Sequence, residues 1–215
     1  MMLLAIDVGN TNIKLGLFSG GRLINSWRLA TDRSKTGDEY GVALQALLMS
    51  AGLKRGDIDG VIMSSVVPGI NFTLEHMLAH YLDKTPMLVG PGIRTGLNIK
   101  LDNPRELGGD IICDCVSAFR RYGGPCIVLD FGTATTISAV SGQGEFLGGA
   151  ICPGVKLALD ALAGKAAKLP NIKSAAQPIE LFRHGMPDRA QHRGQHAVRL
   201  ALRLCRAGGI SYFPL

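Results

Sequence analysis

The chain has 215 residues, of which 47% are hydrophobic, and a formal net charge of +6 at pH 7. This length and apolar content suffice for two small domains, each with a hydrophobic core. The sequence has no uninterrupted run of 18 apolar residues, so no membrane span is predicted. Six arginines and a single acidic residue lie in residues 182–215, so residues 1–181 are nearly neutral and the basic balance does not indicate a nucleic-acid partner.

The first residues and the cysteines both favour a protein of the reducing cytoplasm. Residues 1–6 (MMLLAI) lack a basic n-region and lead directly to Asp7, which predicts a first strand and not a signal peptide. The five cysteines have no metal-site spacing, and Cys113 and Cys115 are too close together for a zinc knuckle. We interpret the cysteines as small buried hydrophobic residues in a compartment where disulfides are rare.

The first predicted strand ends in a turn whose pattern returns 123 residues later. Residues 3–18 and 126–140 each read as an apolar strand, an Asp-x-Gly turn with short polar residues, and a second apolar strand. In both copies glycines precede a third strand-like run, which predicts an internal duplication of a β-hairpin unit. The equivalent residues are Asp7 and Asp130, Gly9 and Gly132, and Gly21 and Gly144.

This turn has the chemistry of a phosphate-binding loop. Its glycine lets backbone N–H groups approach a phosphate without an obstructing Cβ atom, and the aspartate ends the preceding strand. A single Asp-x-Gly turn is more often an ordinary hairpin, but two copies favour a pair of turns that clamp a triphosphate. Further donors to phosphate oxygens are Asn10, Thr11, Lys14, Thr133 and Thr135.

Between and after the two turns, the apolar pattern predicts alternating helices and strands. We expect Asp38 to cap the first helix and Pro104 to open the helix that carries Asp110. The alternation predicts two α/β domains, residues 1–115 and 116–181, followed by a basic tail over 182–215. The predicted helices are residues 38–51, 71–81, 104–122 and 155–162, and the predicted strands between the turns are residues 60–64 and 86–89.

The two turns and four further segments resemble type III pantothenate kinases over about residues 2–181. Residues 7–12 (DVGNTN) and 130–136 (DFGTATT) look like the two phosphate motifs of that family. The four further segments are residues 64–68 (SSVVP), 90–97 (GPGIRTGL), 102–110 (DNPRELGGD) and 148–154 (GGAICPG).

The resemblance implies an α/β protein with the duplicated ribonuclease-H-like fold of actin-like ATPases, with two domains around a nucleotide cleft. It implies ATP-dependent phosphorylation of pantothenate, the first step of coenzyme A biosynthesis, by a cytoplasmic homodimer. The implied cofactors are ATP, Mg²⁺ with the nucleotide, and a monovalent cation, K⁺ or NH₄⁺. Neither nucleic acid nor a membrane is an expected partner.

The resemblance also assigns roles to single residues. Asp110 would accept the proton of the attacking hydroxyl, although the residues alone allow an aspartate that only complements the helix dipole. Asp130 would bind the monovalent cation, with a turn-capping aspartate as the alternative. The implied ATP-binding residues are Asp7, Val8, Gly9, Asn10, Thr11, Asn12, Ile13, Lys14 and Thr133, and the implied substrate-binding residues are Leu101, Gly108, Gly109, Asp110 and Ile111.

Two positions differ from the family pattern. Leu101 stands where the family usually has tyrosine, and Ile111 stands where it usually has arginine. An isoleucine cannot bind a carboxylate through two parallel hydrogen bonds, so we expect a higher pantothenate requirement. These changes leave open a catalytically impaired paralogue that binds nucleotide and acts as a regulatory partner. A chaperone-like or cell-shape ATPase of the same superfamily lacks support, because those proteins are much longer.

Beyond Glu180 the family continues with Ile-Gly-x-Asn-Thr, whereas this chain turns rich in arginine and histidine. The codons for residues 187–193, read one base later, can spell Pro-Ile-Gly-Arg-Asn-Thr, so we interpret residues 182–215 as a frame-shifted reading. The tail histidines lie on no periodic apolar element, which favours a solvated or disordered segment over a metal site.

Overall fold

The computed structural model describes residues 1–90 and 92–165, so the predicted tail over 182–215 lies outside the described residues. The described residues form two compact units, one of Met1–Thr95 with Asn103–Cys113 and the other of Gly96–Asp102 with the residues from Asp114 onward. The chain passes between the units three times, and the last passage falls inside helix α3 (Gly109–Tyr122). Each unit contains its own β-sheet.

The first unit is built on a five-stranded sheet in the order β3-β2-β1-β4-β5. Its first three strands form an antiparallel meander, and β4 runs parallel to β1. A parallel neighbour requires a crossover, which the helices between β3 and β5 provide. The strands are β1 (Met2–Val8), β2 (Asn12–Ser19), β3 (Arg22–Ala30), β4 (Gly60–Ser65) and β5 (Met87–Leu88).

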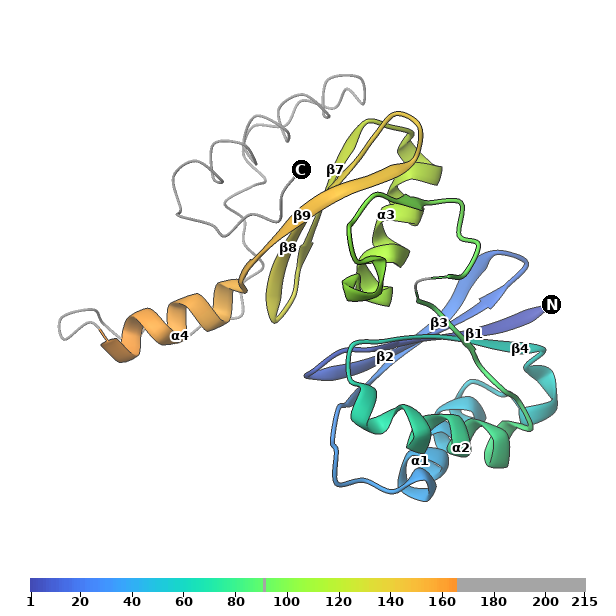
Figure 1. The fold of residues 1–215 in the computed structure, drawn as a ribbon. Helices are drawn as coiled ribbons and strands as arrows, with labels where there is room; N and C mark the ends of the chain where they lie inside the picture. Colours follow the sequence, from blue (N-terminus) through green and yellow to red (C-terminus); the bar gives the residue numbers. More distant parts are fainter. Residues whose placement is uncertain (91, 166–215) are drawn as a thin grey trace, which may run out of the picture. The chain divides into compact units, whose positions relative to one another are not determined.

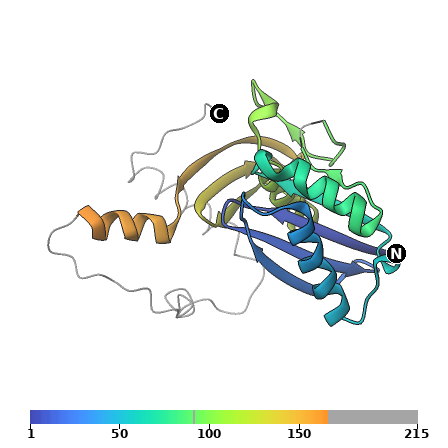
Figure 2. The same cartoon turned by 90° about the horizontal axis from the view of Figure 1, so that it is seen from below.

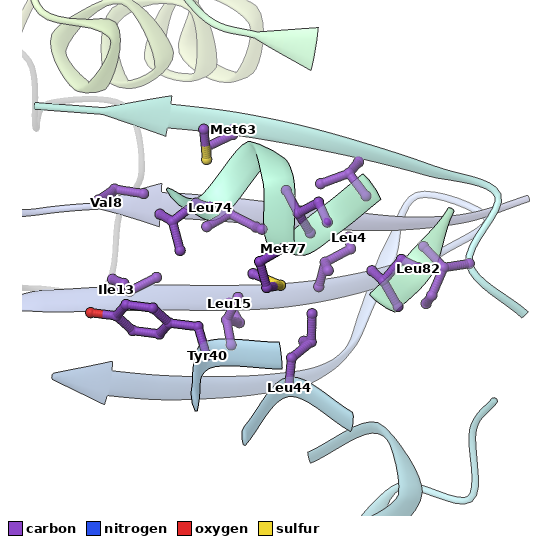
Figure 3. Packing of buried hydrophobic residues seen from close by; sticks show 14 of the residues in the cluster. Leu4, Val8, Ile13, Leu15, Tyr40, Leu44, Met63, Leu74, Met77 and Leu82 are labelled. Carbon is purple, nitrogen blue, oxygen red and sulfur yellow. The ribbon is translucent and has the colours of Figure 1, made fainter. Parts of the chain in front are cut away.

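Helices α1 (Gly37–Ser50) and α2 (Asn71–Leu82) cover one face of this sheet (Figure 1; Figure 2 shows both helices in front of the strands). Every second residue of β1 and β2 is buried beneath them, as expected for strands with one face toward a core. Figure 3 shows these side chains interdigitating with those of the two helices. The largest fully buried side chains of this core, from the strands and the helices together, include Leu4, Ile13, Leu17, Tyr40, Leu44, Met63, Leu74 and Leu78.

The start of α1 differs from the predicted one, because Thr36 and not Asp38 is the N-cap residue. The Thr36 hydroxyl accepts from the Glu39 backbone N–H at 3.3 Å, and the Glu39 carboxylate accepts from the Thr36 backbone N–H at 2.8 Å. This capping box satisfies two backbone donors at once. Because Thr36 is the cap, the helix begins at Gly37, whereas a cap at Asp38 would place its first residue two positions later. Asp38 instead accepts a hydrogen bond from the Tyr81 hydroxyl of α2.

The second unit has a four-stranded sheet in the order β6-β9-β8-β7. Helix α3 packs on this sheet through Cys115, which contacts Ser138, and through the Phe119 ring, which lies close to Gly144. The elements are β6 (Asn98–Ile99), β7 (Cys126–Phe131), β8 (Ala134–Val140), β9 (Glu145–Pro153) and helix α4 (Val155–Lys165).

The predicted duplication is confirmed by the register of the two three-stranded meanders. In β3, Ile24 is skipped between two pairs with β2, and in β9, Leu147 is skipped between two pairs with β8, so both meanders carry a bulge at equivalent positions. Gly21 and Gly144, which precede the third strand in each copy, both have a positive φ, of 81° and 77°. Asp7 and Asp130 are 123 residues apart, whereas their partners Lys14 and Thr136 are 122 apart, because the second turn is one residue shorter.

The predicted helices and strands are confirmed, and besides the start of α1 the start of α3 needs a correction. Residues 104–106 form a separate 3-10 turn, and α3 begins only at Gly109, since Leu107 has extended backbone angles. Asp110 is therefore the second residue of the helix, where a carboxylate favourably meets the helix dipole. Within the described part of the chain, no helix is long and apolar enough to cross a membrane.

The predicted burial of the cysteines is confirmed for Cys115 and is wrong for Cys113. Burial against the second sheet raises the pKa of the Cys115 thiol to about 11, so this thiol stays protonated and inert at neutral pH. Cys113 lies two residues earlier on the same helix and is exposed, because two residues along an α-helix point in nearly opposite directions.

Candidate active site

The turn between β1 and β2 is held by backbone groups and by a residue from β3's end. The Gly9 N–H donates to the Asn12 carbonyl at 3.0 Å, and a Cβ atom on Gly9 would lie 3.1 Å from that oxygen. Thr31 adds two bonds, since its N–H donates to the Thr11 carbonyl at 3.0 Å and its hydroxyl donates to the Gly9 carbonyl at 2.6 Å. Thr31 was not among the predicted site residues, because only the pairing of β3 with β2 brings it to this turn.

The side chains around the first turn divide between the core and the solvent. Asp7 and Lys14 pair across β1 and β2 and form an ion pair, with 3.1 Å between Oδ2 and Nζ. Val8 and Ile13 point into the core, where Figure 3 labels them, so they can offer a ligand only their backbone atoms. The predicted residues Asn10 and Thr11 are exposed at the tip, and Asn12 begins β2 half-buried.

The turn between β7 and β8 repeats this construction with one residue fewer. The Gly132 N–H donates to the Ala134 carbonyl at 2.9 Å, as Gly9 does in the first turn. The Gly154 N–H donates to the Thr133 carbonyl at 3.0 Å, which repeats the bond from Thr31. A Cβ atom on Gly154 would lie 2.4 Å from the carbonyl oxygens of both Gly132 and Thr133, so the shorter turn excludes a side chain there.

The candidate residues of the second unit lie on this shorter turn and near β6. Thr133 is exposed within the turn, and Asp130 is exposed near the end of β7. The Asp130 Oδ2 atom lies 3.7 Å from the position of a Cβ atom on Gly132, so glycine keeps the space beside this carboxylate open. Leu101 follows β6 and is half-buried.

In the first unit, the start of α3 packs tightly against the ends of β4 and β5. A Cβ atom on Gly109 would lie 2.6 Å from the Val89 carbonyl oxygen and 3.0 Å from Ser64 Oγ, so only glycine fits there. Asp110, the next residue, is half-buried, and its Oδ1 atom accepts from the Ile111 N–H at 2.8 Å. Ile111 is also half-buried.

Several predicted residues of the first unit therefore gather at the carboxyl ends of β1 and β4. Lys14 pairs with Asp7, and Asp7 pairs with Ser64, so the three side chains follow one another across the sheet on the face opposite the core. The α3 start adjoins Ser64 and brings Asp110 to the same edge. Carboxyl ends of parallel strands are the usual ligand-binding edge of an α/β sheet.

This arrangement suits the binding of a phosphate next to a carboxylate that can accept a proton. The glycine turn offers backbone N–H groups without a Cβ atom, and Lys14 offers a positive charge. Among the described residues, no group of three or more His, Cys, Asp or Glu side chains could hold a metal ion by itself.

Comparisons with known proteins agree on one family. The family model of type III pantothenate kinases matches residues 3–189. A type III pantothenate kinase from Anaeromyxobacter dehalogenans is 50% identical over 177 residues, which cover 82% of this chain and 70% of that protein. The solved structure of a candidate 2-dehydro-3-deoxygalactonokinase from Sinorhizobium meliloti matches with a TM-score of 0.51 and 13% identity, over 77% of this chain and 57% of that one. The latter likeness concerns the fold alone.

Proposed function

This chain belongs to the type III pantothenate kinase family, and we propose that it transfers a phosphoryl group from ATP to the hydroxyl of pantothenate, which opens coenzyme A synthesis. The observation that carries the proposal is the pair of equivalent glycine turns, each held by the same two backbone hydrogen bonds. Phosphoryl transfer needs positioning and charge neutralisation, and turns held by backbone hydrogen bonds beside a lysine can supply both.

The first turn would hold the nucleotide through the backbone of residues 8–13 and through the side chains of Asn10, Thr11 and Lys14. The Asp7–Lys14 ion pair supports this role, because it fixes the ammonium group beside the turn. Thr133 would bind phosphate from the second turn, where the residue is exposed. In both turns the glycine lets the backbone close tightly, which would hold the exposed turn residues in place for a phosphate.

Asp110 would accept the proton of the pantothenate hydroxyl as that oxygen attacks the phosphorus atom. The support for this role is the Asp110 position in the first helical turn, half-buried and beside two glycines. Gly109 lets the start of α3 pack against Ser64 and the Val89 carbonyl, and Gly108 leaves room for the Asp110 carboxylate, so the two glycines would position Asp110. Leu101 and Ile111 would offer apolar contacts to pantothenate in place of the polar groups usual in the family.

Mg²⁺ bound with the nucleotide would neutralise phosphate charge, and a K⁺ or NH₄⁺ ion at Asp130 would do the same beside the second turn. The Asp130 carboxylate fits a hard cation because it is exposed and Gly132 leaves space beside it. Family membership further supports a cytoplasmic homodimer as the working form.

The kinase assay of the full chain tests the proposal. Incubation with pantothenate, ATP, Mg²⁺ and K⁺ is expected to yield phosphopantothenate and ADP in equal amounts, measured by mass spectrometry and a coupled ADP assay. Because Ile111 cannot pair with the substrate carboxylate, pantothenate should be titrated to saturation. Nucleotide binding without any product at saturating pantothenate would instead support the impaired, regulatory paralogue.

The cation role of Asp130 predicts a specific salt dependence. Turnover is expected to rise when Na⁺ is replaced by K⁺ or NH₄⁺ at constant ionic strength, because these larger ions lose their bound water at a lower cost than Na⁺. Rates measured in the three chloride salts check this. An Asp130→Asn variant should lose the difference between the salts, and equal rates in all three salts for the unmodified chain would contradict the assignment.

A further inference from the structure

Ser64 carries a buried hydroxyl that the fold itself does not use. Its side chain lies near the end of β4 and is only 6% exposed. Within residues 1–90 and 92–165, Ser64 Oγ is buried without a hydrogen-bond partner. A buried, unpaired hydroxyl lowers stability, and an alanine at this position would not carry that cost. The serine therefore indicates a partner that arrives with a ligand.

The position of Ser64 identifies which part of a ligand it would meet. Ser64 pairs with Asp7 on the neighbouring strand, which ends at the first glycine turn. On the other side, Ser64 Oγ lies 3.0 Å from the position of a Cβ atom on Gly109, directly before Asp110. The hydroxyl thus lies between the residues assigned to the nucleotide and the residue assigned to the proton. Neighbouring strands are only about 4.8 Å apart, so this is a short interval.

We propose that the Ser64 hydroxyl donates a hydrogen bond to an oxygen of the phosphoryl group in transfer. This inference rests on the proposed kinase function, because the transferred group must lie between the nucleotide turn and the base. During transfer the bond from the γ-phosphorus to the β–γ bridging oxygen breaks and a bond to the acceptor oxygen forms. The acceptor proton passes to Asp110, and Ser64 keeps its own proton and only stabilises the charged oxygens.

The Ser64→Ala variant separates this role from a structural one. Because the lost hydrogen bond would be one to a charged oxygen, turnover should fall by roughly 10- to 100-fold. The melting temperature without ligand should stay equal or rise, because an unpaired buried hydroxyl has been removed. In thermal-shift measurements with Mg²⁺, ATP should raise the melting temperature of the unmodified chain more than ADP does. The two nucleotides should raise the melting temperature of the Ser64→Ala variant equally.

Ser65 provides a matched control on the same strand. Its hydroxyl donates to Asn71 Oδ1 at 2.6 Å and accepts from the Val67 N–H at 3.1 Å, so its hydrogen bonds are structural. Ser65→Ala should lower the melting temperature and keep the difference between ATP and ADP.

The inference is overturned if Ser64→Ala keeps both the turnover and the ATP–ADP difference, or if the unmodified chain does not distinguish ATP from ADP. Absence of pantothenate turnover in the unmodified chain contradicts the proposed function instead, and the nucleotide comparison still decides the role of Ser64.

Discussion

Replacement of Asp110 by asparagine is expected to lower turnover by roughly 10²–10⁴-fold, the usual contribution of a general base. The amide keeps an oxygen that can accept from the Ile111 N–H, so the start of α3 should keep its geometry. It cannot take up the proton of the attacking hydroxyl, however. ATP binding, measured by calorimetry, should change little, because the proposed nucleotide residues lie on the β1–β2 and β7–β8 turns and Asp110 lies on helix α3.

The control for this variant is Asp114→Asn, which makes the same change one turn further along α3, at an exposed position. It should keep nearly full turnover. If Asp110 only complements the helix dipole, Asp110→Asn should lower the melting temperature slightly and keep most of the activity. That result, in a chain shown to be active, would remove the proton-accepting role.

Much of the fold could be predicted because its signals are local. The Asp-x-Gly turns lie between apolar strands, so the duplication, its glycine positions and the family resemblance were all readable from short segments. The helices were predictable for the same reason, as α2 shows, which begins at Asn71 as expected. The predicted start of α1 was wrong because Thr36 and Glu39 form a capping box, so that Thr36 and not Asp38 is the N-cap residue.

The missed residues depend on contacts that sequence spacing does not report. Thr31 and Gly154 reach their turns only through the pairing of a third strand, and Ser64 meets Gly109 only because α3 returns to the end of β4. The start of α3 was predicted too early, because Pro104 opens a 3-10 turn and not the helix. For Thr31, Gly154 and Ser64 a long-range contact selects the residue, and local propensity does not.

The two turns of the duplication differ in length and in the residue that binds them from the end of the third strand. The residue after the third strand donates its N–H to the turn in both copies, but it is threonine in one and glycine in the other. The first turn has one residue more, which leaves room for the Thr31 side chain and lets its hydroxyl bind the Gly9 carbonyl. The second turn is shorter, and its carbonyl oxygens occupy the space that a side chain would need.

Gly154→Ala is therefore expected to disturb the second turn and to weaken ATP binding. The added Cβ atom would lie 2.4 Å from two backbone oxygens, and backbone atoms cannot move aside as the end of a side chain can. Overpacking of this kind costs about 1–3 kcal/mol, so the free energy of unfolding should fall by this amount in urea titrations. The displaced Thr133 should raise the KM for ATP more than the KM for pantothenate.

Gly142→Ala is the matched control in the same unit, because the nearest atom to its added Cβ, Pro125 Cδ, lies at an ordinary contact distance of 3.8 Å. This variant should keep both the stability and the KM for ATP. Should Gly154→Ala lose stability yet keep its KM for ATP, the second turn would support the fold without binding the nucleotide. If Gly154→Ala keeps both its stability and its KM for ATP, the turn can accommodate a side chain at this position. The close packing around Gly154 would then matter for neither the fold nor ATP binding.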